Sequence, residues 1–181
     1  MKETTAKKKF MWNMAGSLCN SLSSMLLLII VNRISGESRG GFFALAYSTA
    51  QLLFSVGGFE IRPVQSTDIK NKFTFDQYFT SRMLNCIIML ICMIGYIVVN
   101  GYTGVEALTV FWILGYRMVE AVADVYSGLF QQRERIDISG KEMLMRSGIS
   151  TITFTIILWL TDNLLYAAMT LTLTSLVIML F

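Results

Sequence analysis

The stretch at residues 82–99 reads RMLNCIIMLICMIGYIVV and carries a single charge, at its first position. A helix needs about 20 mostly apolar residues to cross the hydrocarbon core of a bilayer. Five further runs of this kind lie at 10–31, 41–59, 105–130, 144–160 and 164–181. The sequence therefore predicts an all-α fold, a polytopic transmembrane bundle of about six helices that forms one domain over residues 1–181.

The overall composition agrees with a membrane protein. Apolar residues make up 54 % of the 181 residues, charged residues make up 15 %, and the mean hydropathy is +0.58, whereas soluble domains carry about 25 % charged residues. The absence of His excludes His-based zinc sites and the Ser-His-Asp and Cys-His nucleophiles. Cys19, Cys86 and Cys92 lie in apolar runs without C-x-x-C spacing. We therefore expect neither an enzyme nor a resident metal or cofactor.

Capping signals mark several of the expected helix starts. A Ser or Thr followed three residues later by Glu or Gln can satisfy two orphan backbone donors. Such pairs are Thr74 with Gln77, Thr103 with Glu106, and Ser139 with Glu142, at the starts of the third, fourth and fifth helices. Asp162 and Asn163 are placed to cap the sixth.

The distribution of Lys and Arg predicts the orientation, because cytoplasmic loops carry an excess of both. Three segments hold 12 of the 15 cations: the N-terminus (Lys2, Lys7, Lys8, Lys9), the second connection (Arg62, Lys70, Lys72, Arg82) and the fourth connection (Arg133, Arg135, Lys141, Arg146). We expect a cytoplasmic N-terminus. The positive charge then reflects topology, and nothing in the sequence indicates a nucleic-acid partner.

Four polar residues share one face of the fourth helix. At 100° per residue, Arg117, Glu120 and Asp124 fall within a narrow stripe that Gln131 continues. Ionisable groups inside a bilayer usually face a bundle interior or an aqueous cavity. Either the stripe faces such a cavity, or it is a packing ladder in which Arg117 pairs with both carboxylates.

Two connections between helices carry further candidates. The second connection, at 60–68, holds Arg62, Asp68 and the only proline. It is either a cytoplasmic gate or a solvated loop whose charges sit near lipid headgroups. The first connection, at 32–41, carries Arg33 and Arg39 on the side where cations are disfavoured. These arginines either attract a phosphate or anchor helix ends among headgroups.

The last apolar run reaches Phe181 without a polar flank or basic anchor. This pattern predicts a truncated chain, and the alternative is a short protein whose last helix ends at the membrane interface.

Several motifs resemble those of bacterial polysaccharide and O-antigen flippases, members of the multidrug/oligosaccharidyl-lipid/polysaccharide exporter superfamily. The most specific is RMVEAVADVYSGLFQ at 117–131. Similar features are the basic N-terminus, the stretch 32–43, the stretch from Arg62 to Asp68 with Tyr78 and Arg82 beyond it, and Arg135, Asp137 and Arg146.

The resemblance implies the N-terminal lobe of a two-lobe exporter that works by alternating access in the bacterial cytoplasmic membrane. Such proteins move undecaprenyl-diphosphate-linked oligosaccharide to the outer leaflet for surface polysaccharide, including the O-antigen of lipopolysaccharide. A single lobe then requires a second lobe or a homodimer partner. Two other functions stay open: a cation-coupled drug antiporter of the same superfamily and a membrane scaffold for glycan assembly.

The resemblance also suggests roles for the polar residues. Arg117 would bind the lipid-linked diphosphate, with Arg33 and Arg39 near the outer mouth. Glu120, Asp124 and Gln131 would line the cavity or couple transport to an ion. Arg62 and Asp68 would belong to the cytoplasmic gate.

Overall fold

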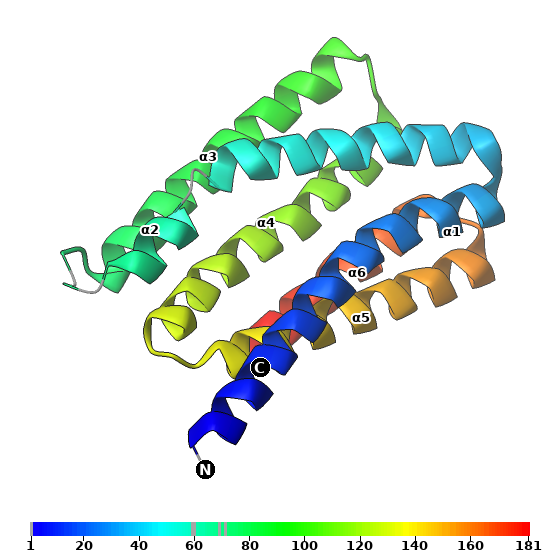
Figure 1. Ribbon diagram of the computed structural model, residues 1–181. Coiled ribbons are helices and arrows are strands. Elements are labelled where there is room, and N and C mark those ends of the chain that lie inside the picture. The colour runs from blue at the N-terminus through cyan, green and yellow to red at the C-terminus, as the bar shows by residue number, and fades with distance from the viewer. Residues whose placement is uncertain (1, 59–60, 69, 71) are drawn as a thin grey trace.

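The computed structural model describes residues 2–58, 61–68, 70 and 72–181. These residues form α1 (Lys2–Gly58), α2 (Ile61–Thr67), α3 (Phe75–Val99), α4 (Gly104–Gln132), α5 (Ile136–Thr161) and α6 (Leu164–Leu180). No strand occurs within the described residues. The predicted all-α bundle is confirmed, and Figure 1 shows the long helices packed with their axes roughly aligned.

The first element, α1, consists of two helices joined by a sharp bend. Gly36 has φ 84° and ψ 172°, a backbone conformation that residues other than glycine rarely adopt. The bend sends the second arm back beside the first, as the blue and cyan ribbons in Figure 1 show. The first two predicted spans are these two arms, although residue 59 lies outside the described residues. The other four predicted spans fall in α3, α4, α5 and α6.

Two of the predicted helix starts are confirmed by their hydrogen bonds. The Thr74 backbone N–H donates to Gln77 Oε1 (2.9 Å) before α3. The Asn163 carboxamide oxygen accepts from the Leu165 N–H (3.0 Å) at the start of α6. Thr103 is the N-cap residue of α4, but its side chain makes no capping bond.

The predicted start of the fifth helix is wrong. A turn of three residues after α4 leads directly into α5 at Ile136, so Ser139 lies one turn inside the helix. Its hydroxyl is turned toward α4 and donates to Ser127 Oγ (2.8 Å). The pair therefore packs two helices together instead of capping one.

The first arm of α1 and α5 run parallel and in register. Lys9 Nζ donates to Glu134 O just before α5 (2.8 Å), and Ser23 Oγ donates to Ser147 O (3.5 Å). The two contacts join residues 125 and 124 positions apart, and a constant separation of this kind requires two helices that point the same way.

Gly16 and Gly140 allow α1 and α5 to touch at backbone level. A Cβ atom at Gly16 would overlap the Gly140 carbonyl, and a Cβ at Gly140 would overlap the backbone of Trp12 and Asn13. Close approach of helix backbones at small residues is a common packing mode in membrane helices.

Gly140→Ala is expected to destabilise the protein by about 2 kcal/mol, because backbone atoms cannot move aside as a flexible side chain can. Gly95→Ala is the matched control. Gly95 in α3 has nothing within 4 Å of its Cβ position, so alanine there should be neutral or slightly stabilising. Denaturant unfolding in micelles measures both, and equal stability of the two variants would contradict the close approach.

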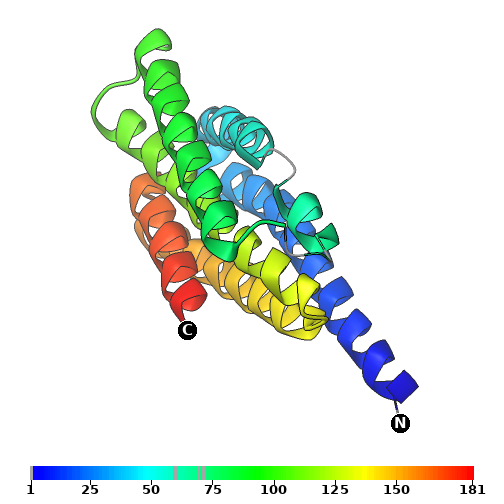
Figure 2. The same cartoon turned by 90° about the vertical axis from the view of Figure 1, so that its left-hand side faces the viewer.

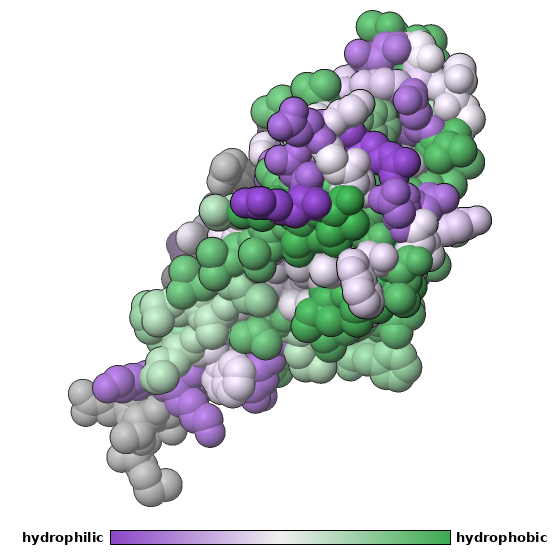
Figure 3. Space-filling view, turned by 90° about the vertical axis from the view of Figure 1, so that its right-hand side faces the viewer, coloured by the Kyte–Doolittle hydropathy of each residue, from purple (hydrophilic) through white to green (hydrophobic). Residues whose placement is uncertain are grey.

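Large apolar side chains cover the outside of the bundle. Ile91 is 63 % exposed and Trp159 is 72 % exposed, and Figure 3 shows a hydrophobic band with hydrophilic residues gathered toward both ends. The segment Ala6–Ser55 of α1, α3 and α5 are long and apolar enough to cross a membrane. At 1.5 Å per residue, the 50 residues of Ala6–Ser55 measure about 75 Å, sufficient for two crossings of a core about 30 Å thick.

Candidate functional site

Arg117, a buried cation near the middle of α4, lies where that helix meets both arms of α1. It is 2 % exposed and forms an ion pair with Glu120 one turn further along α4. Asn20 on the first arm donates to Glu120 Oε1 (2.8 Å). Tyr47 on the second arm places its ring 4.4 Å from the Arg117 guanidinium carbon, a cation–π contact. Both arms of α1 therefore hold this ion pair in place.

A second buried ion pair comes from α5. Arg146 Nε donates to Glu142 Oε1 at 2.6 Å, and Arg146 is 2 % exposed. Arg146 also lies within electrostatic range of Glu120. The predicted placement of Lys141 and Arg146 in the fourth connection is wrong, because α5 already begins at Ile136.

Asp124 belongs to a different cluster from Arg117. Its two carboxylate oxygens accept from Arg62 Nη1 on α2 (3.1 Å) and from Arg82 Nη2 on α3 (2.8 Å). Of the predicted packing ladder, the Arg117–Glu120 pair is present, but the pairing of Arg117 with Asp124 is wrong. Seven residues separate these two by about 10 Å along α4, whereas α2 and α3 supply nearer cations.

Arg82 was expected in the second connection. It is fully buried within α3, because that helix begins at Phe75 and places Arg82 about two turns inside. Sequence alone does not predict the pairing of Asp124 on α4 with Arg82 on α3, because the pairing depends on how the two helices pack.

The second connection contains a short helix, α2, that lies against α4. Gln65 is fully buried, and a Cβ at Gly128 would overlap its carboxamide. Ile61 packs with Tyr78 and Val125 in a small apolar cluster. The expectation of a solvated loop at this point is wrong, because α2 buries one face while Arg62 reaches Asp124.

Asp68 directly follows α2, and its side chain makes hydrogen bonds that stabilise the next turn. Its carboxylate accepts from the backbone N–H groups of Lys72 (3.0 Å) and Phe73 (3.1 Å) and from the Tyr78 hydroxyl (3.0 Å). Gln132 Nε2 donates to the Asp68 carbonyl (2.9 Å). The backbone hydrogen bonds from Lys72 and Phe73 lower the pKa of the Asp68 carboxyl below its ordinary value.

A lowered pKa in the folded protein means that the Asp68 carboxylate stabilises this turn above the unfolded pKa of about 3.9, and that this stabilisation is lost as the pH falls through the folded value. Hydrogen-exchange protection of the Lys72 and Phe73 amides is therefore expected to persist from neutral pH to about pH 4 and to fall in more acidic solution. Asp68→Asn should weaken this protection at neutral pH. Unchanged protection in that variant would show that the carboxylate does not hold the turn.

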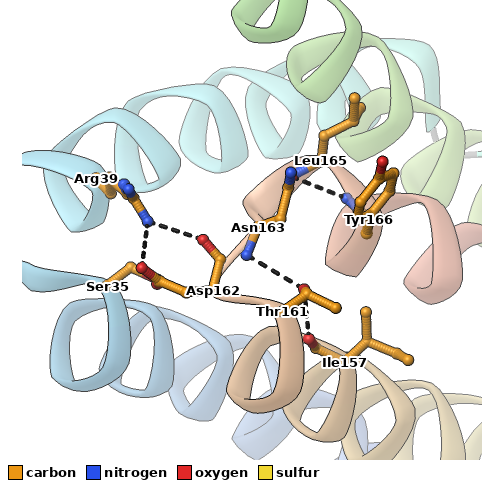
Figure 4. A network of polar contacts seen from close by, with 8 residues as sticks. All are labelled: Ser35, Arg39, Ile157, Thr161, Asp162, Asn163, Leu165 and Tyr166. Carbon is orange, nitrogen blue, oxygen red and sulfur yellow. Dashed lines mark hydrogen bonds and ion pairs between the residues drawn. The ribbon is translucent and has the colours of Figure 1, made fainter.

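Arg33 and Arg39 lie at the opposite end, on either side of the Gly36 bend. Arg39 Nη1 forms an ion pair with Asp162 Oδ2 (3.0 Å), and Ser35 Oγ donates to Asp162 Oδ1 (3.1 Å), as Figure 4 shows. Arg33 is exposed. Arg39 precedes the Arg117 contact Tyr47 by eight residues, about 12 Å along α1, so neither arginine joins the buried cluster.

Gln131 is exposed near the end of α4, so the buried polar stripe ends at Asp124. Its neighbour Gln132 makes the contact with Asp68 instead. Within the part of the chain that the structure describes, no three Asp, Glu or Cys residues gather to hold a metal ion.

The ion pairs of α2, α3, α4 and α5 are here called the buried network. It comprises four arginines (Arg62, Arg82, Arg117, Arg146) and three carboxylates (Glu120, Asp124, Glu142), of which Arg82, Arg117, Arg146 and Glu120 are buried and the other three are partly exposed. Nε and Nη2 of Arg117 and Nη1 of Arg146 are buried and have no hydrogen-bond partner among the described residues. Buried polar groups are nearly always hydrogen-bonded, so these N–H groups can donate to the oxygens of a water molecule or an anion.

Comparison with protein-family models, curated proteins and solved structures found no match to this chain.

Proposed function

We propose that the protein is the N-terminal lobe of a flippase that moves undecaprenyl-diphosphate-linked oligosaccharide across the bacterial cytoplasmic membrane. The observation that carries this proposal is the pair of buried arginines Arg117 and Arg146, whose donors include unpartnered ones, in a bundle with an apolar outer surface. The resemblance of 117–131 to glycan flippases supports the same substrate class.

The chemistry of the substrate explains the need for these arginines. A diphosphate that leaves water for a bilayer interior loses its hydration and needs compensating charge. Arginine suits this role because its planar guanidinium stays charged and donates two parallel hydrogen bonds to phosphate oxygens. Arg117 and Arg146 are enclosed in this structure, so α1 and α4 have to separate before the substrate can reach them. Movement against a second lobe or a homodimer partner supplies such an opening.

A scaffold for glycan assembly is the second candidate, because every carboxylate in the buried network is already paired with an arginine. In that function the charges only fix helix packing. The same pairing gives less support to a cation-coupled drug antiporter, which needs a carboxylate that is available to its cargo or coupling ion.

Deletion of the gene separates these functions when the leaflet position of the lipid-linked glycan is measured. Loss of a flippase leaves single lipid-linked units on the inner leaflet, whereas loss of a scaffold leaves units that reach the outer leaflet but are not polymerised. We expect inner-leaflet accumulation, reversed when the gene is restored. Outer-leaflet units in the deletion strain would contradict the flippase proposal.

The proposed orientation gives a labelling prediction. Lys70 and Arg135 belong to the cation-rich end and Asn100 and Asp162 to the other, so cysteines at the first pair should face the cytoplasm. The background needs Cys19, Cys86 and Cys92 replaced. An impermeant thiol reagent added to intact cells is expected to label position 100 and 162 variants only. Labelling at position 135 from outside would reverse the orientation.

A further inference from the structure

A cluster of positive charges lies at one end of the bundle, away from the buried network. Three segments far apart in sequence supply it: the start of α1, the turn between α4 and α5, and the first turns of α5. We define the basic patch as Lys7, Lys8, Lys9, Arg133, Arg135 and Lys141. Within residues 7–9 and 133–141 the acidic residues are Glu134 and Asp137, so six cations lie beside two carboxylates.

Specific contacts hold the three segments together. Lys9 Nζ donates to the Glu134 carbonyl (2.8 Å), which joins α1 to the α4–α5 turn. Lys141 Nζ lies 5.3 Å from the centre of the Trp12 ring, which joins α5 to α1. The basic patch therefore belongs to the folded bundle and is not a flexible tail.

Only part of the charge in the basic patch is neutralised by protein groups. Arg135 Nε contacts Asp137 Oδ1 at 3.4 Å, and both lie at the surface edge of α5. Lys7, Lys8, Arg133 and Lys141 are exposed. The basic patch therefore has several exposed cations that are available to a ligand at this end of the molecule.

An apolar surface begins directly next to these cations. Phe10, Met11 and Met14, which follow the three lysines along α1, are 59 %, 56 % and 48 % exposed. Figure 2 shows the start of α1 projecting past the α4–α5 turn, so this segment is open on several sides. Hydrophilic residues beside a hydrophobic band are also seen at the lower end of the face in Figure 3.

We propose that the basic patch binds the headgroup of an anionic phospholipid, with the acyl chains lying against the apolar side chains of Phe10, Met11 and Met14. A phospholipid has the same order of charge and apolar surface, and basic pockets between helices at a membrane boundary suit such headgroups. An acidic protein segment would match the cations but not the adjoining apolar surface. The proposal requires that the protein sits in a bilayer, but it is independent of what the protein transports.

The test measures which lipids stay bound to the purified protein. Detergent-solubilised protein is mixed with equal amounts of phosphatidylglycerol and phosphatidylcholine, and bound lipid is counted by native mass spectrometry. Wild-type protein is expected to prefer phosphatidylglycerol. We expect the ratio of bound phosphatidylglycerol to bound phosphatidylcholine to fall at least about tenfold in the variant Lys7→Gln/Lys8→Gln/Arg133→Gln/Lys141→Gln. The variant Lys7→Arg/Lys8→Arg/Lys141→Arg keeps the charge and should retain the preference.

The control is Lys70→Gln/Lys72→Gln, which removes two exposed lysines from the other cation-rich connection. It should keep the wild-type preference. An equal loss in this control would overturn the proposal, because net charge alone would then explain binding. Equal retention of the two lipids by wild-type protein would overturn it as well. Displacement of phosphatidylglycerol by millimolar glycerol phosphate would instead identify a site for soluble phosphate.

Discussion

Arg117→Gln is expected to stop glycan export while the protein still reaches the membrane. The substitution removes a buried cation, and a diphosphate bound there would lose its compensating charge and its bidentate partner. Folding should survive, because Glu120 keeps its hydrogen bond from Asn20 and remains within electrostatic range of Arg146. Export of labelled surface glycan, normalised to membrane protein level, measures the effect. A loss of at least about 100-fold is expected from the magnitude of such buried charge contacts.

Two companion variants distinguish substrate binding from helix packing. Arg117→Lys keeps the charge without the planar fork, so partial export is expected. Arg117→Gln combined with Glu120→Gln removes the ion pair as a neutral unit. If Arg117 only neutralises Glu120, this double variant should export normally. Asp124 needs no substitution in this experiment, because it pairs with Arg62 and Arg82. Recovery of export in the double variant would leave packing as the role of Arg117.

The second large effect concerns stability. Asp124→Asn is expected to lower the free energy of unfolding by about 3 kcal/mol, because it leaves the buried Arg82 guanidinium without its carboxylate partner on α4. Adding Arg82→Met should recover much of this loss, since the buried charge that has lost its Asp124 partner is then removed. Denaturant unfolding in mixed micelles measures both variants.

Asp162→Asn is the matched control for Asp124→Asn. It makes the same chemical change at the Arg39–Asp162 ion pair, whose two side chains are 52 % and 60 % exposed. Exposed pairs contribute about 1 kcal/mol or less, and asparagine tolerates the left-handed conformation of residue 162 (φ 44°). If both substitutions had the same small effect, the Asp124 cluster would not be a structural requirement.

Hydropathy was sufficient to predict the number and position of the long helices, since each apolar run has to form internal backbone hydrogen bonds. It could not predict α2. That helix has seven residues, includes a proline, and is stabilised by burying Gln65 and Ile61 against neighbours that are distant in sequence.

The candidate site was predictable only within α4. Helical periodicity correctly placed Arg117 beside Glu120, since both belong to one helix. It gave no information about Arg82, Arg146 or Arg62, which reach the same region from three other helices. Counting cations by loop assigned the buried residues Arg82 and Arg146 to connections between helices, because a residue near the end of an apolar run can lie on either side of the helix boundary.

The parallel pairing of the first arm of α1 with α5 has a consequence for the order of biosynthesis. Ser23 leaves the ribosome long before its partner Ser147, which lies 124 positions away. At about 5 to 20 residues per second, the wait is roughly 6 to 25 s. During this interval the polar side of the first arm lacks α5, and a chaperone or insertase that shields it until α5 arrives would raise the yield of correctly assembled protein.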